Sequence, residues 1–315
     1  MASANDSPLA ADAMDGAAPS TREQSPSLDG ARGGRWLIVA AAVMWSSSGL
    51  FVKAPLFDDW PAETRGALLA FWRALFAGLL LLPAVRRPRW TMGLVPLCLA
   101  FAAMNVSYLT AMTLTTAANA IWLQSTAPWW VFLAGVLFLR EPFMPAERVP
   151  LVIGGLGLAI ILGFQLQGQG YLGVWWGLFS GMTYAGVVLS LRALRHFETV
   201  WIVAIAHLAT AGVIFPYVAY RNQWPGGPQL CVLAMFGVFQ MGLPYVFFAR
   251  GLRTITSQEA TGIGLLEPVL LPVWVWLAWR EAPAASTLVG GGLILAGLVL
   301  RYVIIPQLKR REAVG

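Results

Sequence analysis

Residues 115–142 read TTAANAIWLQSTAPWWVFLAGVLFLREP, and residues 256–282 read TSQEATGIGLLEPVLLPVWVWLAWREA. In each stretch a proline interrupts an apolar run, and an Arg-Glu pair follows that proline at the same spacing. The matched residues are Pro128, Arg140 and Glu141 in the first stretch and Pro268, Arg280 and Glu281 in the second. The two stretches therefore predict an internal repeat with a period of about 140 residues.

The composition predicts a membrane protein. Of the 315 residues, 58% are hydrophobic and 11% are charged, against roughly 25% charged in a soluble domain. Apolar runs near the roughly 20 residues needed to cross a bilayer follow one another from Trp36 onward. The ten predicted spans are residues 36–55, 66–83, 92–112, 117–139, 149–165, 171–190, 199–219, 229–249, 260–279 and 285–305. The predicted class is an all-α integral membrane protein with ten transmembrane helices.

The spans divide into two halves of five. Residues 36–165 form the first predicted repeat and residues 171–305 the second. Because five is an odd number, the second half must enter the membrane with opposite polarity, and the halves are inverted. Other residues match between the halves. Trp45 and Lys53 correspond to Tyr184 and Arg192, and Arg73 corresponds to His207. The last helix of each half is rich in glycine, at 154, 155 and 157 in the first and at 290, 291, 292 and 297 in the second.

The basic residues predict the orientation. Sixteen of the 21 Lys and Arg residues fall on one side of the predicted topology and four on the other, with Arg73 inside a span. This bias places both termini in the cytoplasm of a multi-pass protein of the cell (inner) membrane. Residues 1–35 are predicted to be a disordered cytoplasmic tail, not a cleaved signal peptide, and residues 306–315 a second cytoplasmic tail. Basic residues spread over many loops do not indicate nucleic-acid binding.

Taken together, these stretches resemble a known family. With MWSSSGLFVK at 44–53 and FWRALFAGLLLL at 71–82, the chain is similar to EamA-like members of the drug/metabolite transporter superfamily over residues 36–305. The resemblance implies ten helices, no ATP, and movement of small polar or aromatic metabolites such as amino acids, often outward. Ser46 departs from the pattern, because glycine is common at that position in the family.

Glu267 is the leading candidate for function. It lies about eight residues into its span, roughly 12 Å from the end, and is the one carboxylate predicted at that depth. Burying a charged carboxylate in a bilayer costs at least about 2.5 kcal/mol, so it must be protonated, paired or facing a wet cavity. The adjacent Pro268 frees a backbone carbonyl. Glu267 is interpreted as a site for a proton or a substrate ammonium, with a protonated structural carboxyl as the alternative.

Other polar and aromatic side chains at middle depth are predicted to line a substrate site. They are Trp45, Ser46, Asn105, Trp122, Gln124, Tyr184, Gln240 and Tyr245. His207 is a second candidate for proton coupling, against a packing role, and Arg73 is a candidate contact for an anion. Glu141 and Glu281 are interpreted as structural positions beside Arg140 and Arg280.

The leading function is therefore a secondary transporter of small metabolites, amino acids or related compounds, with export favoured. A nucleotide-driven pump within this chain is excluded because neither Lys53 nor Lys309 ends a phosphate-binding loop. Two histidines and two membrane-embedded cysteines predict no metal site and no cofactor. The expected partners are a small-molecule substrate, the lipid bilayer and, if transport is coupled to them, protons. The sequence does not determine the oligomeric state, and a monomer is one of the options. The alternatives are a non-transporting sensor or scaffold and an intramembrane hydrolase built on Ser180 and His207.

Overall fold

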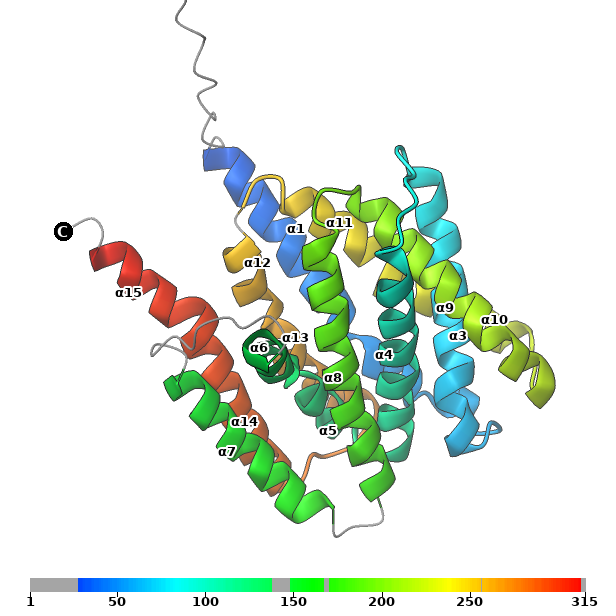
Figure 1. Ribbon diagram of the computed structural model, residues 1–315. Helices are drawn as coiled ribbons and strands as arrows, with labels where there is room; N and C mark the ends of the chain where they lie inside the picture. Colours follow the sequence, from blue (N-terminus) through cyan, green and yellow to red (C-terminus); the bar gives the residue numbers. More distant parts are fainter. Residues whose placement is uncertain (1–27, 138–147, 167–169, 256, 313–315) are drawn as a thin grey trace, which may run out of the picture.

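The computed structural model describes residues 28–137, 148–166, 170–255 and 257–312. Within these ranges the chain is helical and contains no strand. Ten helical segments are long and apolar enough to cross a membrane, which confirms the predicted fold class. We number these segments spans 1 to 10 in chain order (Figure 1).

The first half contains spans 1 to 5. They are α1 (Leu28–Ser46) with α2 (Ser48–Val52), α3 (Ala62–Leu81) with η2 (Leu82–Ala84), α4 (Leu94–Leu114), α5 (Ala117–Gln124) with α6 (Ala127–Leu137), and α7 (Arg148–Gln165), and the short helix η1 (Pro55–Phe57) follows span 1. The second half contains spans 6 to 10. They are α8 (Tyr171–Ala193), α9 (Thr199–Arg221), α10 (Gly227–Met235) with the π-helical η4 (Phe236–Gly242) and α11 (Leu243–Gly251), α12 (Ser257–Gly264) with α13 (Leu266–Trp279), and α14 (Ala285–Val299) with the π-helical η5 (Leu300–Ile304) and α15 (Ile305–Glu312).

Both ends of the helical region extend beyond the predicted spans. The first helix begins at Leu28, not at residue 36, and the last continues to Glu312. The early start is stabilised by packing, because a Cβ atom on Gly34 would lie 3.1 Å from the carbonyl oxygen of Gly251 in α11. Hydropathy along a single segment carries no information about such a contact, so the sequence did not reveal it.

The packing of the spans follows the inverted repeat. Span 3 packs along span 6 through α4 and α8, and its counterpart, span 8, packs along span 1 through α11 and α1. Matching spans also pair with each other, α3 with α9 and α7 with α14. An exchange of the two halves therefore maps this set of contacts onto itself, which is the arrangement found in inverted-repeat transporters.

Spans 4 and 9 are both interrupted four residues before a proline. Helix α5 ends at Gln124, and α12 ends at Gly264. Proline has no N–H to donate to the carbonyl four residues earlier, so Pro128 and Pro268 each remove the hydrogen bond that would have continued the helix. Span 1 is broken at Ser47, whose Oγ donates to the carbonyl of Met44 at 2.6 Å. Broken helices inside a bilayer occur where they line a cavity or a binding site.

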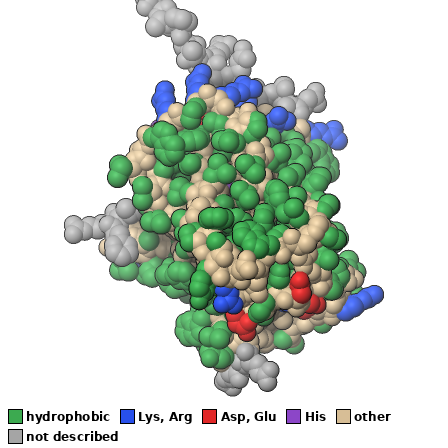
Figure 2. Space-filling view, turned by 90° about the vertical axis from the view of Figure 1, so that its right-hand side faces the viewer, with side chains coloured by type: hydrophobic (Ala, Val, Ile, Leu, Met, Phe, Trp, Pro, Cys, Tyr) green, Lys and Arg blue, Asp and Glu red, His purple; other side chains and the backbone are tan. Residues whose placement is uncertain are grey.

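The outer surface suits a bilayer. Figure 2 shows Lys and Arg side chains along the upper edge of the molecule, a broad hydrophobic belt below them, and acidic side chains near the lower end. Exposed leucine, valine and phenylalanine side chains such as Leu79, Val213 and Leu288 belong to this hydrophobic surface. In Figure 1, α1 begins and α15 ends at the upper end of the molecule. We call this the terminal end and the opposite one the far end.

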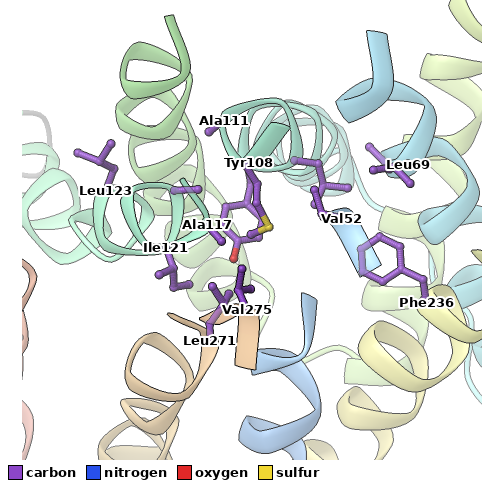
Figure 3. Close-up of a cluster of buried hydrophobic side chains, with 14 of the residues drawn as sticks. Val52, Leu69, Tyr108, Ala111, Ala117, Ile121, Leu123, Phe236, Leu271 and Val275 are labelled. Atoms are coloured by element: carbon purple, nitrogen blue, oxygen red, sulfur yellow. The ribbon is translucent and has the colours of Figure 1, made fainter. Parts of the chain in front are cut away.

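The far half of the bundle is tightly packed. The largest buried cluster includes Tyr108, Ala117, Ile121, Leu271 and Val275, each at most 5% exposed. Figure 3 shows these side chains converging from spans 3, 4 and 9. These side chains therefore form a close-packed layer between spans 3, 4 and 9.

Spans 5 and 10 pack backbone against backbone through glycine. A Cβ atom on Gly157 would lie 2.3 Å from the carbonyl oxygen of Gly290, whereas nothing lies within 4 Å of a Cβ atom on Gly155. We expect Gly157→Val to force α7 and α14 apart and to lower the free energy of unfolding by about 1–3 kcal/mol. Thermal unfolding in detergent, followed by tryptophan fluorescence, measures the effect. Gly155→Val is the matched control, and an equal loss in both variants would contradict the assigned contact.

Candidate functional site

Arg73 is the centre of a polar network in the middle of the bundle. It lies in α3 and is 2% exposed. Its guanidinium donates to Oδ1 of Asn105 in α4 and to Oε1 of Gln240 in η4, the latter at 3.3 Å. It also lies 5.1 Å from the centre of the Phe236 ring. Both acceptors are neutral amides, so within the described residues no carboxylate is bonded to this buried cation.

The two amides are themselves held in place. Nδ2 of Asn105 donates to the carbonyl of Phe101 at 2.9 Å, and Nε2 of Gln240 donates to the carbonyl of Trp45 at 3.0 Å. Each amide nitrogen is thus engaged elsewhere, which leaves the amide oxygen pointing at Arg73. The π-helical turn of η4 carries Gln240, and such turns often occur at functional sites.

A row of aromatic rings continues from this network. Trp45 meets Tyr245 edge to face at 5.2 Å, Tyr245 meets His207 at 5.9 Å, and His207 meets Phe101 at 4.8 Å. His207 is fully buried, and neither of its ring nitrogens has a hydrogen-bond partner among the described residues. Its observed contacts are those of a packed ring, and its role in proton coupling stays a hypothesis.

Glu267 lies in the first turn of α13, immediately after the break in span 9. The residue is partly exposed, and within the described residues its carboxylate makes no hydrogen bond and no ion pair. It interacts electrostatically with Arg73 and with the side chains of Tyr108, Tyr184 and Tyr245. The first turn of a helix carries a partial positive charge, which favours an anion at this position. Glu267 is therefore an acceptor at a helix break, with no partner among the described residues.

Tyr184, another predicted lining residue, lies on span 6 and is 40% exposed. Among the described residues it shares no hydrogen bond or ring contact with Arg73, Trp45 or Glu267. Its place in a substrate site stays a prediction.

Ser46 joins span 1 to span 9. Its Oγ donates to the carbonyl of Val43 at 2.7 Å and accepts a hydrogen bond from Nε1 of Trp274 at 2.9 Å. Two residues on, Oγ of Ser48 lies 3.3 Å from the hydroxyl of Tyr108. The serines at the break in span 1 therefore connect the site to spans 3 and 9. Trp274 and Tyr108 were not predicted as site residues, because nothing in the sequence reports the direction of an aromatic side chain on an apolar helix.

Two predicted lining residues lie apart from the network. Trp122 packs against Gly291 of α14, and within the described ranges its Nε1 has no hydrogen-bond partner. Gln124 is 8% exposed, and its Nε2 likewise has no partner in that part of the chain. Among the described residues, neither shares a hydrogen bond or a ring contact with Arg73, Trp45 or the groups around them. Both were predicted from depth alone, whereas the rotation of α5 about its axis directs Trp122 toward span 10.

The structure does not support the nucleophile and base of a hydrolase. Oγ of Ser180 donates to the carbonyl of Gly177 at 2.7 Å, and His207 has no hydrogen-bond partner. A serine nucleophile requires its base within hydrogen-bond reach. These two residues therefore do not form the pair that such an enzyme needs.

The family model for the EamA-like transporter family matches residues 32–163 and again residues 171–303. The chain belongs to this family. The two matches fall on the two halves of the bundle, so each five-span half of this EamA-like transporter is one copy of the family unit. The chain is a multi-pass membrane protein of a transporter family, and a small-molecule substrate and a lipid environment follow from that membership.

Named relatives of this EamA-like transporter are also transporters. An uncharacterised transporter of Archaeoglobus fulgidus is 27% identical over 278 residues, which cover 86% of this chain and 97% of the relative. The pseudopaline exporter CntI of Pseudomonas aeruginosa is 27% identical over 293 residues, covering 86% of this chain and 96% of CntI. A solved crystal structure covers 87% of this chain and 98% of its own with a TM-score of 0.61, and at 17% identity it supports the fold alone.

The EamA-like transporter also contains an ion pair that sequence analysis assigned differently. Glu281 was placed beside Arg280, but its carboxylate binds Lys53, 2.7 Å away at the end of span 1. Its repeat counterpart Glu141 lies outside the described residues. The sequence held one hint of this pair. Each half has a basic residue at the end of its first span, Lys53 or Arg192, and a glutamate after its fourth span, Glu141 or Glu281.

Proposed function

We propose that this chain is a secondary transporter that carries small metabolites, amino acids or related compounds, out of the cell by alternating access. The observation that carries the proposal is the unpaired carboxylate of Glu267. It is partly exposed at mid-membrane depth, at a helix break, and within electrostatic reach of the buried Arg73. A carboxylate within a membrane span is costly when, as here, it has no partner among the described residues, and such residues are commonly functional. Glu267 then accepts the ammonium of a substrate or a coupled proton.

Arg73 supplies the opposite charge. A substrate with both an ammonium and a carboxylate would face Glu267 on span 9 and the guanidinium on span 2. Asn105 and Gln240 hold that guanidinium in a fixed position, and Trp45, Tyr184 and Tyr245 supply aromatic surface around the same region. A site with a few placed polar groups and an aromatic lining is typical for small metabolites.

The direction of opening follows from burial. The far end holds the largest buried cluster, around Tyr108, Ala117 and Val275, and the ion pair of Lys53 with Glu281. The terminal end carries most of the basic residues, and the positive-inside rule makes it cytoplasmic. We therefore assign this structure to a state closed toward the outside and accessible from the cytoplasm of an inner-membrane protein with both termini inside. Outward transport is also consistent with CntI, a relative named as an exporter.

Flux measured in proteoliposomes tests the proposal. The purified chain is reconstituted, and vesicles are loaded with a mixture of amino acids and small amine-containing acids under a pH gradient of either direction. We expect protein-dependent release of at least one compound, measured by mass spectrometry against protein-free vesicles. No release under either gradient would contradict a transport function and favour a sensor or scaffold.

A further inference from the structure

We propose that Lys53, Glu281 and the chain turn at Thr115–Ala117 form a gate that holds the far end closed, and that this gate must open in each transport cycle. The proposal rests on the proposed transport function, because a gate is needed where a substrate passes. Nζ of Lys53 lies 2.7 Å from Oε2 of Glu281 and donates to the carbonyl of Thr115 at 2.8 Å. The other carboxylate oxygen of Glu281, Oε1, accepts from the N–H of Ala117 at 2.7 Å. We call this set of four groups the clasp.

Each charge in the clasp is placed against a helix end of matching polarity. Thr115 is the C-cap residue of α4, at a helix end where carbonyl oxygens lack helical partners. Nζ of Lys53 donates to the carbonyl oxygen of Thr115. Ala117 is the first residue of α5, where N–H groups lack partners, and Glu281 binds that N–H. Cations at a helix C-terminus and anions at an N-terminus are stabilised by the helix dipole. The clasp is therefore stronger than an ordinary surface ion pair.

The backbone at Arg280 directs Glu281 into the clasp. Arg280 has φ 57° and ψ 20°, in the left-handed region that a residue with a Cβ atom adopts only at a free-energy cost. This turn ends α13 and points the chain back toward the bundle. A strained residue kept at one end of a helix indicates that the position it enforces is used.

Two further contacts beneath the clasp hold span 1 against span 9. Nε1 of Trp279 donates to the carbonyl of Leu50 at 3.1 Å. A Cβ atom on Gly49 would lie 2.3 Å from a methyl carbon of Val275, so the Val275 side chain packs directly against the backbone of span 1. A substrate that leaves Glu267 toward the far end must separate these surfaces, and separation of span 1 from span 9 breaks the Lys53–Glu281 bond.

Spans 2 and 7 are joined to each other by contacts that are separate from the clasp. At the terminal end, the carboxylate of Glu198 accepts from the backbone N–H groups of Arg86 and Arg87. At the far end, Thr64 donates to Gln223 at 3.1 Å. Spans 1 and 9 are joined at the terminal end by Arg35 and Glu259 and at the far end by the clasp. Opening of the far end between spans 1 and 9 therefore breaks the clasp while the Arg35–Glu259 pair can stay closed.

Thiol accessibility tests the gate without any knowledge of the substrate. Val52, which is 1% exposed beneath Lys53, is replaced by cysteine in a background with Cys98→Ser and Cys231→Ser. The protein is placed in nanodiscs, so that both ends are open to a charged methanethiosulfonate reagent. We expect Glu281→Gln to raise the rate of labelling about tenfold or more. The free energy of a hydrogen bond to a charged group corresponds to at least about a tenfold change in the equilibrium between closed and open forms.

Asp58→Asn is the matched control, because it breaks the Asp58–Arg65 ion pair at the same end, which does not join span 1 to span 9. We expect no change in labelling from this substitution. Equal labelling in the Glu281→Gln protein and in the parent would overturn the gate. This readout requires no transport, so it separates failure of the gate from failure of the proposed function.

A disulfide lock tests whether the gate must open. In the same cysteine-free background, Gly49→Cys with Val275→Cys places two thiols at the closest approach of spans 1 and 9. We expect oxidation to stop flux and dithiothreitol to restore it, whereas Val275→Cys alone is unaffected by the oxidant. Full flux through the oxidised protein would overturn the gate. Loss of flux in the reduced and oxidised forms alike would count against the proposed function, and the labelling assay would still decide the gate.

Discussion

Glu267→Gln is expected to reduce transport roughly ten- to 150-fold while the protein remains folded. The glutamine keeps the shape of the side chain and removes its charge and its ability to bind a proton. A hydrogen bond to a charged group contributes about 1.5–3 kcal/mol, which corresponds to that range of rates. Efflux of the identified substrate from proteoliposomes measures the loss. Because Glu267 makes no hydrogen bond or ion pair among the described residues, the substitution breaks no observed bond.

Glu259→Gln is the matched control for Glu267→Gln. Glu259 lies in the same span, but it is paired with Arg35 at 2.5 Å and the two side chains are 36% and 55% exposed. Exposed ion pairs contribute about 0–1 kcal/mol, so this substitution should leave transport nearly unchanged. Flux by Glu267→Gln equal to that of the parent, with the same dependence on pH between 5.5 and 8, would remove Glu267 from the mechanism.

The sequence was sufficient to predict the ten spans and the inversion of the two halves. Hydropathy is a local property, and each span has its own apolar run, so the spans could be located one by one. The repeat was visible because Pro128 and Pro268 stand at matching positions, and the same prolines mark the breaks in spans 4 and 9. The early start of α1 could not be predicted, because it depends on contact between Gly34 and Gly251 of another span.

The sequence could predict which residue types lie at the depth of the candidate site, but not which way each side chain points from its helix. Depth in the bilayer identified Arg73, Asn105 and Gln240, which the structure joins by hydrogen bonds. The same criterion selected Trp122, which packs against span 10 instead. A helix of uniformly apolar residues carries no periodic signal for its rotation, so tertiary packing decides which side chains face the centre. The contact of Lys53 with Glu281 could not be predicted either, because it joins two residues far apart in the sequence and depends on how the spans pack.

The asymmetry between the halves is concentrated at one position. Ala127 precedes Pro128 in span 4, whereas Glu267 precedes Pro268 in span 9. Both residues stand at the start of the second segment of a broken span, α6 and α13. The repeated fold thus supplies two equivalent breaks, and a charged group is added at one of them. The other ionisable group of the site, Arg73, has His207 as its repeat counterpart, so its position is asymmetric as well.

Arg73→Met is expected to be the most destabilising of the substitutions considered. It keeps an unbranched apolar side chain but leaves the amide oxygens of Asn105 and Gln240 without their donor in a buried setting. Leaving a buried acceptor without its donor costs about 1–3 kcal/mol for each group. The free energy of unfolding, followed by tryptophan fluorescence during titration with a denaturing detergent, measures the loss.

The combination of Arg73→Met with Glu267→Gln tests whether the two charges act as a pair. In the Glu267→Gln protein, Arg73 has already lost the attraction of the carboxylate, so its removal should cost less than in the parent. We expect the double variant to be more stable than the sum of the single effects by about 0.5–3 kcal/mol. Arg65→Met with Asp58→Asn is the control cycle for an ion pair with an exposed partner, where about 0–1 kcal/mol is expected. Strict additivity for Arg73 and Glu267 would mean that a substrate meets two independent charges and not one site of paired opposite charge.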